Sequence, residues 1–208
     1  MTRFLLISAF QLLILSSVFA QIAPTDSPYY QDGSYQVIAD SDASINPTVF
    51  TFRPDAQAGE TFPVFFFQLG ANGIGSSVIN ENTYDLYLEH LASFGYIVIV
   101  VNSATGGFPN GAVYEDIYDW YLDKLSDSNH WMSSLANPAS VAIGGHSLGG
   151  VQATAFLENH QTEIGGIVYF ASYPSQGFLG IGAHNVSGYS GTVLSIAGTE
   201  DEDSTPAE

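Results

Sequence analysis

The segment from Gly145 to Gly149, which follows the pattern G-x-S-x-G, constrains the fold of this chain more than any other feature. It follows the apolar run Val141–Ile143 and precedes a helix-compatible stretch, Val151–Leu157. A serine between a buried strand and a helix lies on a tight turn that exposes its hydroxyl group as a nucleophile. Small neighbours fit such a turn, because its backbone angles are unusual and the helix must pack close to its strand. The pattern therefore predicts a nucleophilic Ser147, with an ordinary glycine-rich turn as the alternative.

Apolar strands alternate with helices along most of the chain. Continuous apolar runs are typical of strands that a parallel sheet buries on both faces. Strands are predicted at Val49–Pro54, Phe62–Leu69, Tyr96–Val101, Val141–Ile143, Ile164–Ala171 and Thr192–Ala197. Helical spacing of apolar residues predicts helices over Glu81–Ser93 and Tyr114–Leu125, the second with Ile117, Tyr121, Leu122 and Leu125 on its apolar side. The alternation predicts an α/β fold with a doubly wound sheet in a single domain.

The first twenty residues have the features of a secretory signal peptide. A positive start at Arg3 precedes an almost continuous apolar run, Phe4–Leu15, and small residues follow up to Ala20. The apolar run is short for a membrane span, so we predict a signal peptide over 1–20, with a signal anchor as the alternative. Residues 21–44 are predicted to form an N-terminal arm, and residues 45–208 the domain of a secreted protein.

The charge balance excludes some partners. The chain has 3 Lys and Arg residues against 21 Asp and Glu residues, and its formal net charge is -18. Such a surface repels nucleic acid and anionic membranes. No segment after the signal peptide approaches the length of a membrane span, so we expect none. Weak calcium binding by this acidic surface is a further prediction. The chain has no cysteine, so neither disulfides nor thiol chemistry contribute.

Two further segments lie where acyl transfer from Ser147 needs them. A glycine-rich turn that includes Gly70 and Gly73 leaves the end of a predicted buried strand. We predict that the backbone N–H groups of Ala71 and Leu148 stabilise the oxyanion of the tetrahedral intermediate. The alternative for the first turn is a plain strand-to-helix loop.

The second segment is the acidic run Glu200–Asp203, which follows the last predicted strand. An acid at this point matches the orienting carboxylate of a catalytic triad, so Asp201 is the predicted acid and Asp203 the reserve. A solvated acidic loop and a weak calcium site remain the alternatives.

The chain resembles the α/β-hydrolase superfamily from about residue 45 to the C-terminus. Within the superfamily it is most similar to the group of secreted cutinase-like polyester hydrolases, chlorophyllases and dienelactone hydrolases. The resemblance rests on Leu69–Gly73, Tyr87–Val100, Gly145–Gly150 and Gly198–Asp201. It implies that Tyr173 lines the acyl pocket, as an aromatic residue does in polyester hydrolases; a buried loop tyrosine is the alternative.

The resemblance also implies a catalytic histidine after Asp201, since the order along the chain is Ser, Asp or Glu, then His. All five histidines precede Asp201: His90, His130, His146, His160 and His184. Only His184, by an unusual fold-back, is free enough to reach Ser147. We therefore expect a fragment of a longer hydrolase that lacks the last strand, the histidine loop and the closing helix. A genuine short protein that has lost catalysis is the alternative.

These observations predict a secreted serine hydrolase of carboxylic esters, with a small-molecule or polymeric ester as substrate and no cofactor. Ser147 would form the acyl-enzyme, which water would then hydrolyse. A hydrolase-fold binding or scaffold protein without catalysis is the alternative. A calcium-dependent surface protein, based on acidity and the absent cysteines, is a third reading.

Overall fold

The computed structural model describes residues 30–70, 81–101, 112–172 and 184–198, and the side chains of residues 81–83 are not included. The chain divides into two compact units, Met1–Asp32 and Gly33–Glu208. Of the first unit only residues 30–32 are described.

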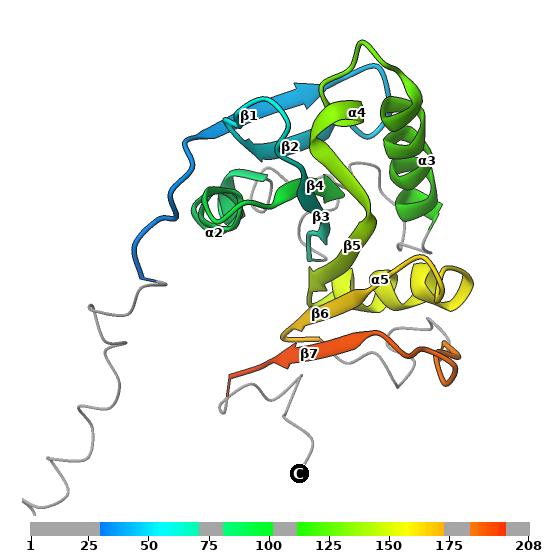
Figure 1. Cartoon of the computed structure of the whole chain (residues 1–208). Coiled ribbons are helices and arrows are strands. Elements are labelled where there is room, and N and C mark those ends of the chain that lie inside the picture. The colour runs from blue at the N-terminus through cyan, green and yellow to red at the C-terminus, as the bar shows by residue number, and fades with distance from the viewer. Residues whose placement is uncertain (1–29, 71–80, 102–111, 173–183, 199–208) are drawn as a thin grey trace, which may run out of the picture. The chain divides into compact units, whose positions relative to one another are not determined.

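A seven-stranded sheet forms the centre of the second unit, in the order β1-β2-β4-β3-β5-β6-β7 among the described residues (Figure 1). Strands β1 and β2 pair antiparallel with each other, and β2 pairs antiparallel with β4. From β4 to β7 every neighbouring pair is parallel. The strands are β1 Val37–Asp42, β2 Val49–Pro54, β3 Phe62–Gln68, β4 Ile97–Val101, β5 Ala136–His146, β6 Gly166–Phe170 and β7 Thr192–Ile196.

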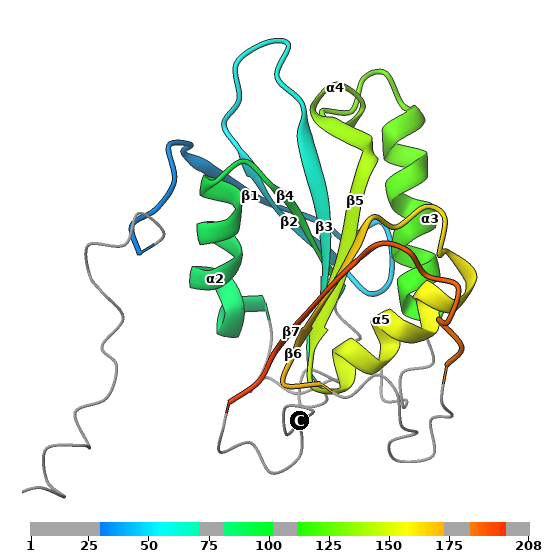
Figure 2. The ribbon, with the colours of Figure 1, turned by 60° about the horizontal axis from the view of Figure 1, so that its bottom comes forward.

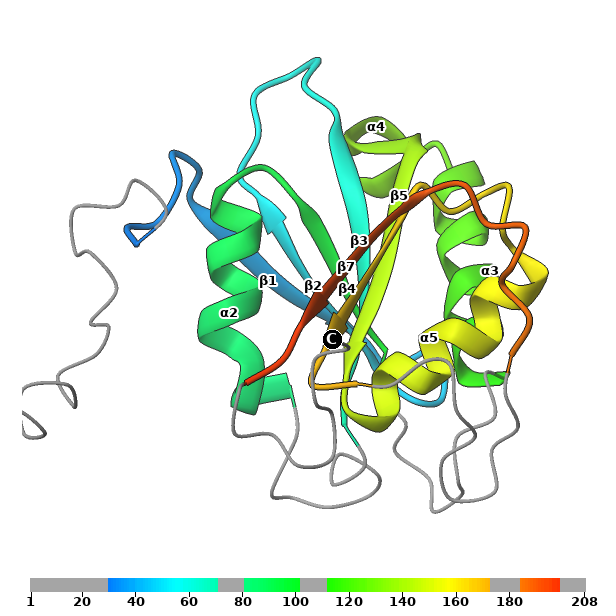
Figure 3. The same cartoon turned by 90° about the horizontal axis from the view of Figure 1, so that it is seen from below.

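Helices cover both faces of this sheet. Helix α2 (Glu81–Ser93) lies on one face, whereas α3 (Ala112–Ser126) and α5 (Leu148–Asn159) lie on the other, and the short α4 (Met132–Leu135) precedes β5 (Figures 2 and 3). The sequence therefore predicted the fold class correctly: it is an α/β structure with a mostly parallel, doubly wound sheet.

Side chains alternate between two hydrophobic clusters along the inner strands. In β3, Phe66 joins the cluster under α3 and α5, whereas Phe65 and Phe67 join the cluster that includes Leu88 of α2. The same alternation holds in β4, where Val98 belongs to the α2 cluster. Both sets of side chains are buried, which explains why these strands have no polar alternation in the sequence.

Local signals fix the two long helices that the sequence predicted. Helix α2 ends before Gly95, whose φ of 94° is a left-handed conformation that glycine adopts without strain. In α3 the buried side includes Ile117, Trp120 and Tyr121, but Leu122 is 44% exposed, contrary to the prediction. Leu122 lies about 100° around the helix from Tyr121, and the aromatic residues before it occupy the buried side instead.

The two edges of the sheet are formed by β1 and β7 among the described strands. Strand β1 lies inside the segment 21–44 that was predicted to be an arm, and pairs with β2 from Val37 to Asp42. At the other edge, β7 pairs only with β6 among the described strands. Its side chains are exposed, including Val193 at 58%.

Candidate active site around Ser147

Ser147 occupies the single residue between the end of β5 and the start of α5. Its backbone has φ 52° and ψ −123°, which is unfavourable for any residue with a side chain. Among the described non-glycine residues only Ser147 and Ala171 have positive φ. The Ser147 N–H donates to the Phe170 carbonyl at 2.8 Å, and its carbonyl accepts from the Gly150 N–H at 3.0 Å. The fold thus holds the serine on a strained turn from both sides.

The small residues of the pattern are required by close backbone packing. A Cβ atom on Gly149 would lie 2.4 Å from the Gln68 carbonyl oxygen at the end of β3. A Cβ on Gly145 would lie 2.4 Å from the backbone of Gly149. These distances are far shorter than a carbon atom tolerates, so the first turn of α5 can rest on β3 and β5 only with glycine at both positions.

The end of β3 lies directly beside this turn. Gln68 pairs with Gly145 in the parallel register, and a Cβ on Gly70 would lie 2.8 Å from the His146 Nδ1 atom. Leu148 is the first residue of α5, so its N–H has no acceptor within the helix. The structure therefore leaves this N–H as a donor next to Ser147, where the sequence predicted an oxyanion contact. Ala71, the second predicted donor, lies outside the described residues.

A strained serine between a central parallel strand and a helix agrees with the comparison with known protein families. A sequence model of the alpha/beta hydrolase family matches residues 74–207. The chain belongs to the alpha/beta hydrolase family. Membership supports hydrolase activity and agrees with the mostly parallel sheet, but it does not identify a subgroup or a substrate. No curated protein matches the chain.

Two other predicted site residues of this hydrolase, Asp201 and Tyr173, lie outside the described residues. Strands β6 and β7, which precede Tyr173 and Asp201, are parallel to β5. Their carboxyl ends therefore lie on the same side of the sheet as the carboxyl end of β5. The Ala171 N–H donates to the Ile196 carbonyl at 2.8 Å, which joins the ends of β6 and β7. The roles of Asp201 and Tyr173 stay predictions.

The two histidines near the end of α5 bind glutamates far from Ser147. His184 Nδ1 lies 3.0 Å from Glu158 Oε2. Glu158 follows Ser147 by nearly the full length of the helix, roughly 16 Å along its axis. His160 caps the same helix end, and its ring nitrogens lie 2.6 Å from Glu163 and 2.9 Å from Glu115. The fold-back of His184 towards Ser147 is therefore absent from the structure.

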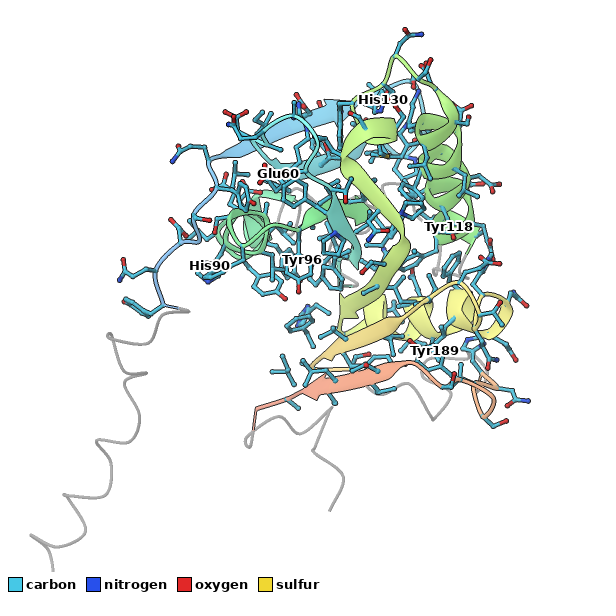
Figure 4. All side chains as sticks on the ribbon, in the orientation of Figure 1. Glu60, His90, Tyr96, Tyr118, His130 and Tyr189 are labelled. Carbon is cyan, nitrogen blue, oxygen red and sulfur yellow. The ribbon has the colours of Figure 1, made fainter. Side chains whose placement is uncertain are left out.

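The histidines outside α5 also have other surroundings. His130 lies beside α4 (Figure 4), at the start of β5, and the eleven residues of β5 separate it from Ser147 by on the order of 30 Å. Burial lowers the pKa of His130, and the charge of Lys124 adds to this effect. His90 lies in the last turn of α2, which leads to the start of β4, whereas Ser147 follows the end of β5. The His90 and Phe94 ring centroids are 5.0 Å apart.

His146 has a contact that sequence reasoning missed. Its Nδ1 atom lies 2.8 Å from the hydroxyl oxygen of Tyr84, a residue 62 positions earlier in the first part of α2. The sequence predicted the helix that contains Tyr84, but no contact for this residue. A tyrosine near the start of this helix was the only signal in the sequence, and it did not identify His146 as the partner.

The described residues contain no group of three or more His, Cys, Asp or Glu side chains that could hold a metal ion. The acidic run at 200–203 is not among them, so weak calcium binding there stays a prediction. In the same part of the chain, no helix has both the length and the apolar character needed to cross a membrane.

Proposed function

We propose that this chain is a secreted serine hydrolase that cleaves carboxylic esters through an acyl-enzyme on Ser147. The backbone of Ser147, at φ 52° and ψ −123° between a central strand and a helix, carries the proposal. Strained conformations of this kind persist where packing enforces them, and they cluster at active sites. Partial exposure of the residue leaves room for a substrate to reach it.

The proposed reaction has two steps. The Ser147 hydroxyl oxygen attacks the acyl carbon, the ester C–O bond breaks, and the alcohol leaves with the proton taken from the serine. The N–H groups of Leu148 and Ala71 stabilise the negative oxygen of each tetrahedral intermediate. Water then attacks the acyl-enzyme and releases the carboxylic acid. Asp201 is proposed to orient a histidine that moves the protons and that follows it in the chain order of the family.

The substrate class rests on the resemblance to cutinase-like polyester hydrolases, chlorophyllases and dienelactone hydrolases. It favours small-molecule or polymeric esters, with Tyr173 lining the acyl pocket. The predicted signal peptide, residues 1–20, supports an extracellular location, and the net charge of -18 supports an uncharged substrate rather than nucleic acid.

One observation favours a second candidate function. The described hydrogen bonds of four histidines, His130, His146, His160 and His184, go to partners other than the Ser147 hydroxyl. A binding or scaffold protein that keeps the hydrolase fold without catalysis is consistent with this arrangement.

Ester hydrolysis by matched variants distinguishes the two functions. We would assay p-nitrophenyl esters of increasing acyl length and a polyester film with the wild type, Ser147→Ala and Ser134→Ala. Ser134 is an exposed serine in α4, at the opposite end of β5. A hydrolase predicts that Ser134→Ala keeps the wild-type rate, whereas Ser147→Ala loses at least about a thousandfold. Ester binding without turnover, unchanged by Ser147→Ala, would support the binding protein.

A further inference from the structure

We propose that Tyr84 is a positioning residue for this hydrolysis: its hydroxyl group holds the end of β3 against the turn that carries Ser147. The inference rests on the proposed function and names a residue that the family pattern does not include. Tyr84 lies on α2, whereas the two segments that it joins are the ends of neighbouring parallel strands.

The first contact of Tyr84 is with the turn itself. Its hydroxyl oxygen lies 2.8 Å from Nδ1 of His146, the residue immediately before Ser147. The two rings have centroids 5.9 Å apart. The Tyr84 ring also packs edge-on against Phe67 of β3, with centroids 5.1 Å apart. Packing of the ring therefore fixes the direction in which the hydroxyl points.

The second contact is with the end of β3. Burial raises the pKa of Tyr84, so the phenol is neutral at physiological pH, and a hydrogen bond from the backbone of Gly70 partly opposes that rise. A hydrogen bond that lowers the pKa of a phenol is one that its oxygen accepts. The backbone of Gly70 therefore lies beside the Tyr84 oxygen, and we assign the phenol proton to the hydrogen bond with His146 Nδ1.

This assignment of the phenol proton sets the tautomer of His146. Since Nδ1 accepts the phenol proton, the neutral imidazole carries its own proton on Nε2. The Tyr84 oxygen also sets the separation of the ends of β3 and β5, because it contacts Gly70 after β3 and His146 at the end of β5. The segment after Gly70 and the turn after His146 supply the two proposed oxyanion donors, so a shift between them separates those donors.

The kinetic effect of losing this contact follows from the geometry. A displacement of about 1 Å at a catalytic group lowers the rate by up to about a hundredfold. Tyr84→Phe keeps the ring packing and removes the hydroxyl, so we expect kcat to fall about 10- to 100-fold while KM changes less than about twofold. Tyr87→Phe is the matched control: Tyr87 lies one turn later on α2 and contacts Phe67 and Phe170 through its ring.

A double-mutant cycle tests whether Tyr84 acts through His146. We would measure kcat for Tyr84→Phe, for His146→Phe and for the double variant, with thermal unfolding to verify folding. Two residues that act as one unit predict a combined loss well below the product of the single losses. A combined loss equal to that product, or a Tyr84→Phe variant as active as Tyr87→Phe, overturns the inference.

NMR of the histidine ring nitrogens provides a readout that needs no activity. The wild type should show His146 with Nδ1 unprotonated and Nε2 protonated, and Tyr84→Phe should change the Nδ1 signal whereas Tyr87→Phe should not. A protonated Nδ1 in the wild type, or no response to Tyr84→Phe, refutes the role of Tyr84 and leaves the proposed function standing. Absence of ester hydrolysis by the wild type refutes the proposed function, and the role of Tyr84 in it.

Discussion

Replacing Ser147 by glycine is expected to give a more stable protein than replacing it by alanine. Both substitutions remove the hydroxyl group, so their difference reports the backbone conformation alone. At φ 52° and ψ −123° a residue with a Cβ atom bears about 1–3 kcal/mol of strain, which glycine lacks. Glycine loses about 0.4–1 kcal/mol through the greater entropy of the unfolded chain. The central values, about 2 and about 0.7 kcal/mol, leave Ser147→Gly more stable by about 1.3 kcal/mol, or about 3–5 °C in Tm for a chain of this length.

Thermal and urea unfolding, followed by circular dichroism, measures this difference. Ser134→Gly and Ser134→Ala are the control pair, because Ser134 lies in the helical segment α4 and is not among the residues with positive φ. There the order should reverse, with alanine more stable by about 0.5–1 kcal/mol. If Ser147→Gly unfolds at or below the Tm of Ser147→Ala while the control pair reverses as expected, Ser147 is not strained and the argument fails.

Two further substitutions test the surroundings of the turn. Gly149→Ala, whose Cβ would lie 2.4 Å from a backbone oxygen of β3, should abolish ester hydrolysis and lower Tm, whereas Gly188→Ala, which meets only a flexible side chain, should change neither; equal effects would contradict the packing argument. Burial lowers the pKa of His160, but hydrogen bonds to Glu163 and Glu115 raise it overall. The stability that this pairing adds should be complete below the unfolded pKa of about 6.5 and be lost as pH rises through the raised folded pKa. The unfolding free energy of wild type minus His160→Gln should thus fall as pH rises above about 6.5, and a constant difference would refute the assignment.

The architecture was predictable because each inner strand is buried on both faces. Phe65 and Phe66 point to opposite faces of the sheet, yet each joins a hydrophobic cluster, so the sequence shows one continuous apolar run. Helix α2 was also predictable to the residue, since Gly95 supplies an unambiguous end signal.

Strand β1 and the rotation of α3 were not predictable in this way. Strand β1 has only a short apolar start at Val37 and then polar residues, because an edge strand buries little, and so it carries no clear period. The exposure of Leu122 depends on which side chains of α3 meet the sheet. That choice is made by tertiary packing of the aromatic residues around Tyr121, which helical spacing alone does not determine.

The candidate site also has a part that the sequence predicted and a part that it did not. The turn at Ser147 follows from a local pattern of five residues, and the glycine contacts explain why that pattern is informative. The contact between Tyr84 and His146 joins positions 62 residues apart and depends on how α2 lies on the sheet. No local pattern contains that information. The roles of Ala71, Asp201 and Tyr173 stay predictions.

Covalent labelling shows whether Ser147 is an activated nucleophile. We would treat the protein, purified as its source produces it, with a fluorophosphonate and identify the labelled peptide by mass spectrometry. We expect one phosphonyl group per molecule on Ser147, none on Ser147→Ala, and unchanged labelling of Ser134→Ala. A wild-type protein that remains unlabelled, or that is labelled at another residue, would contradict it.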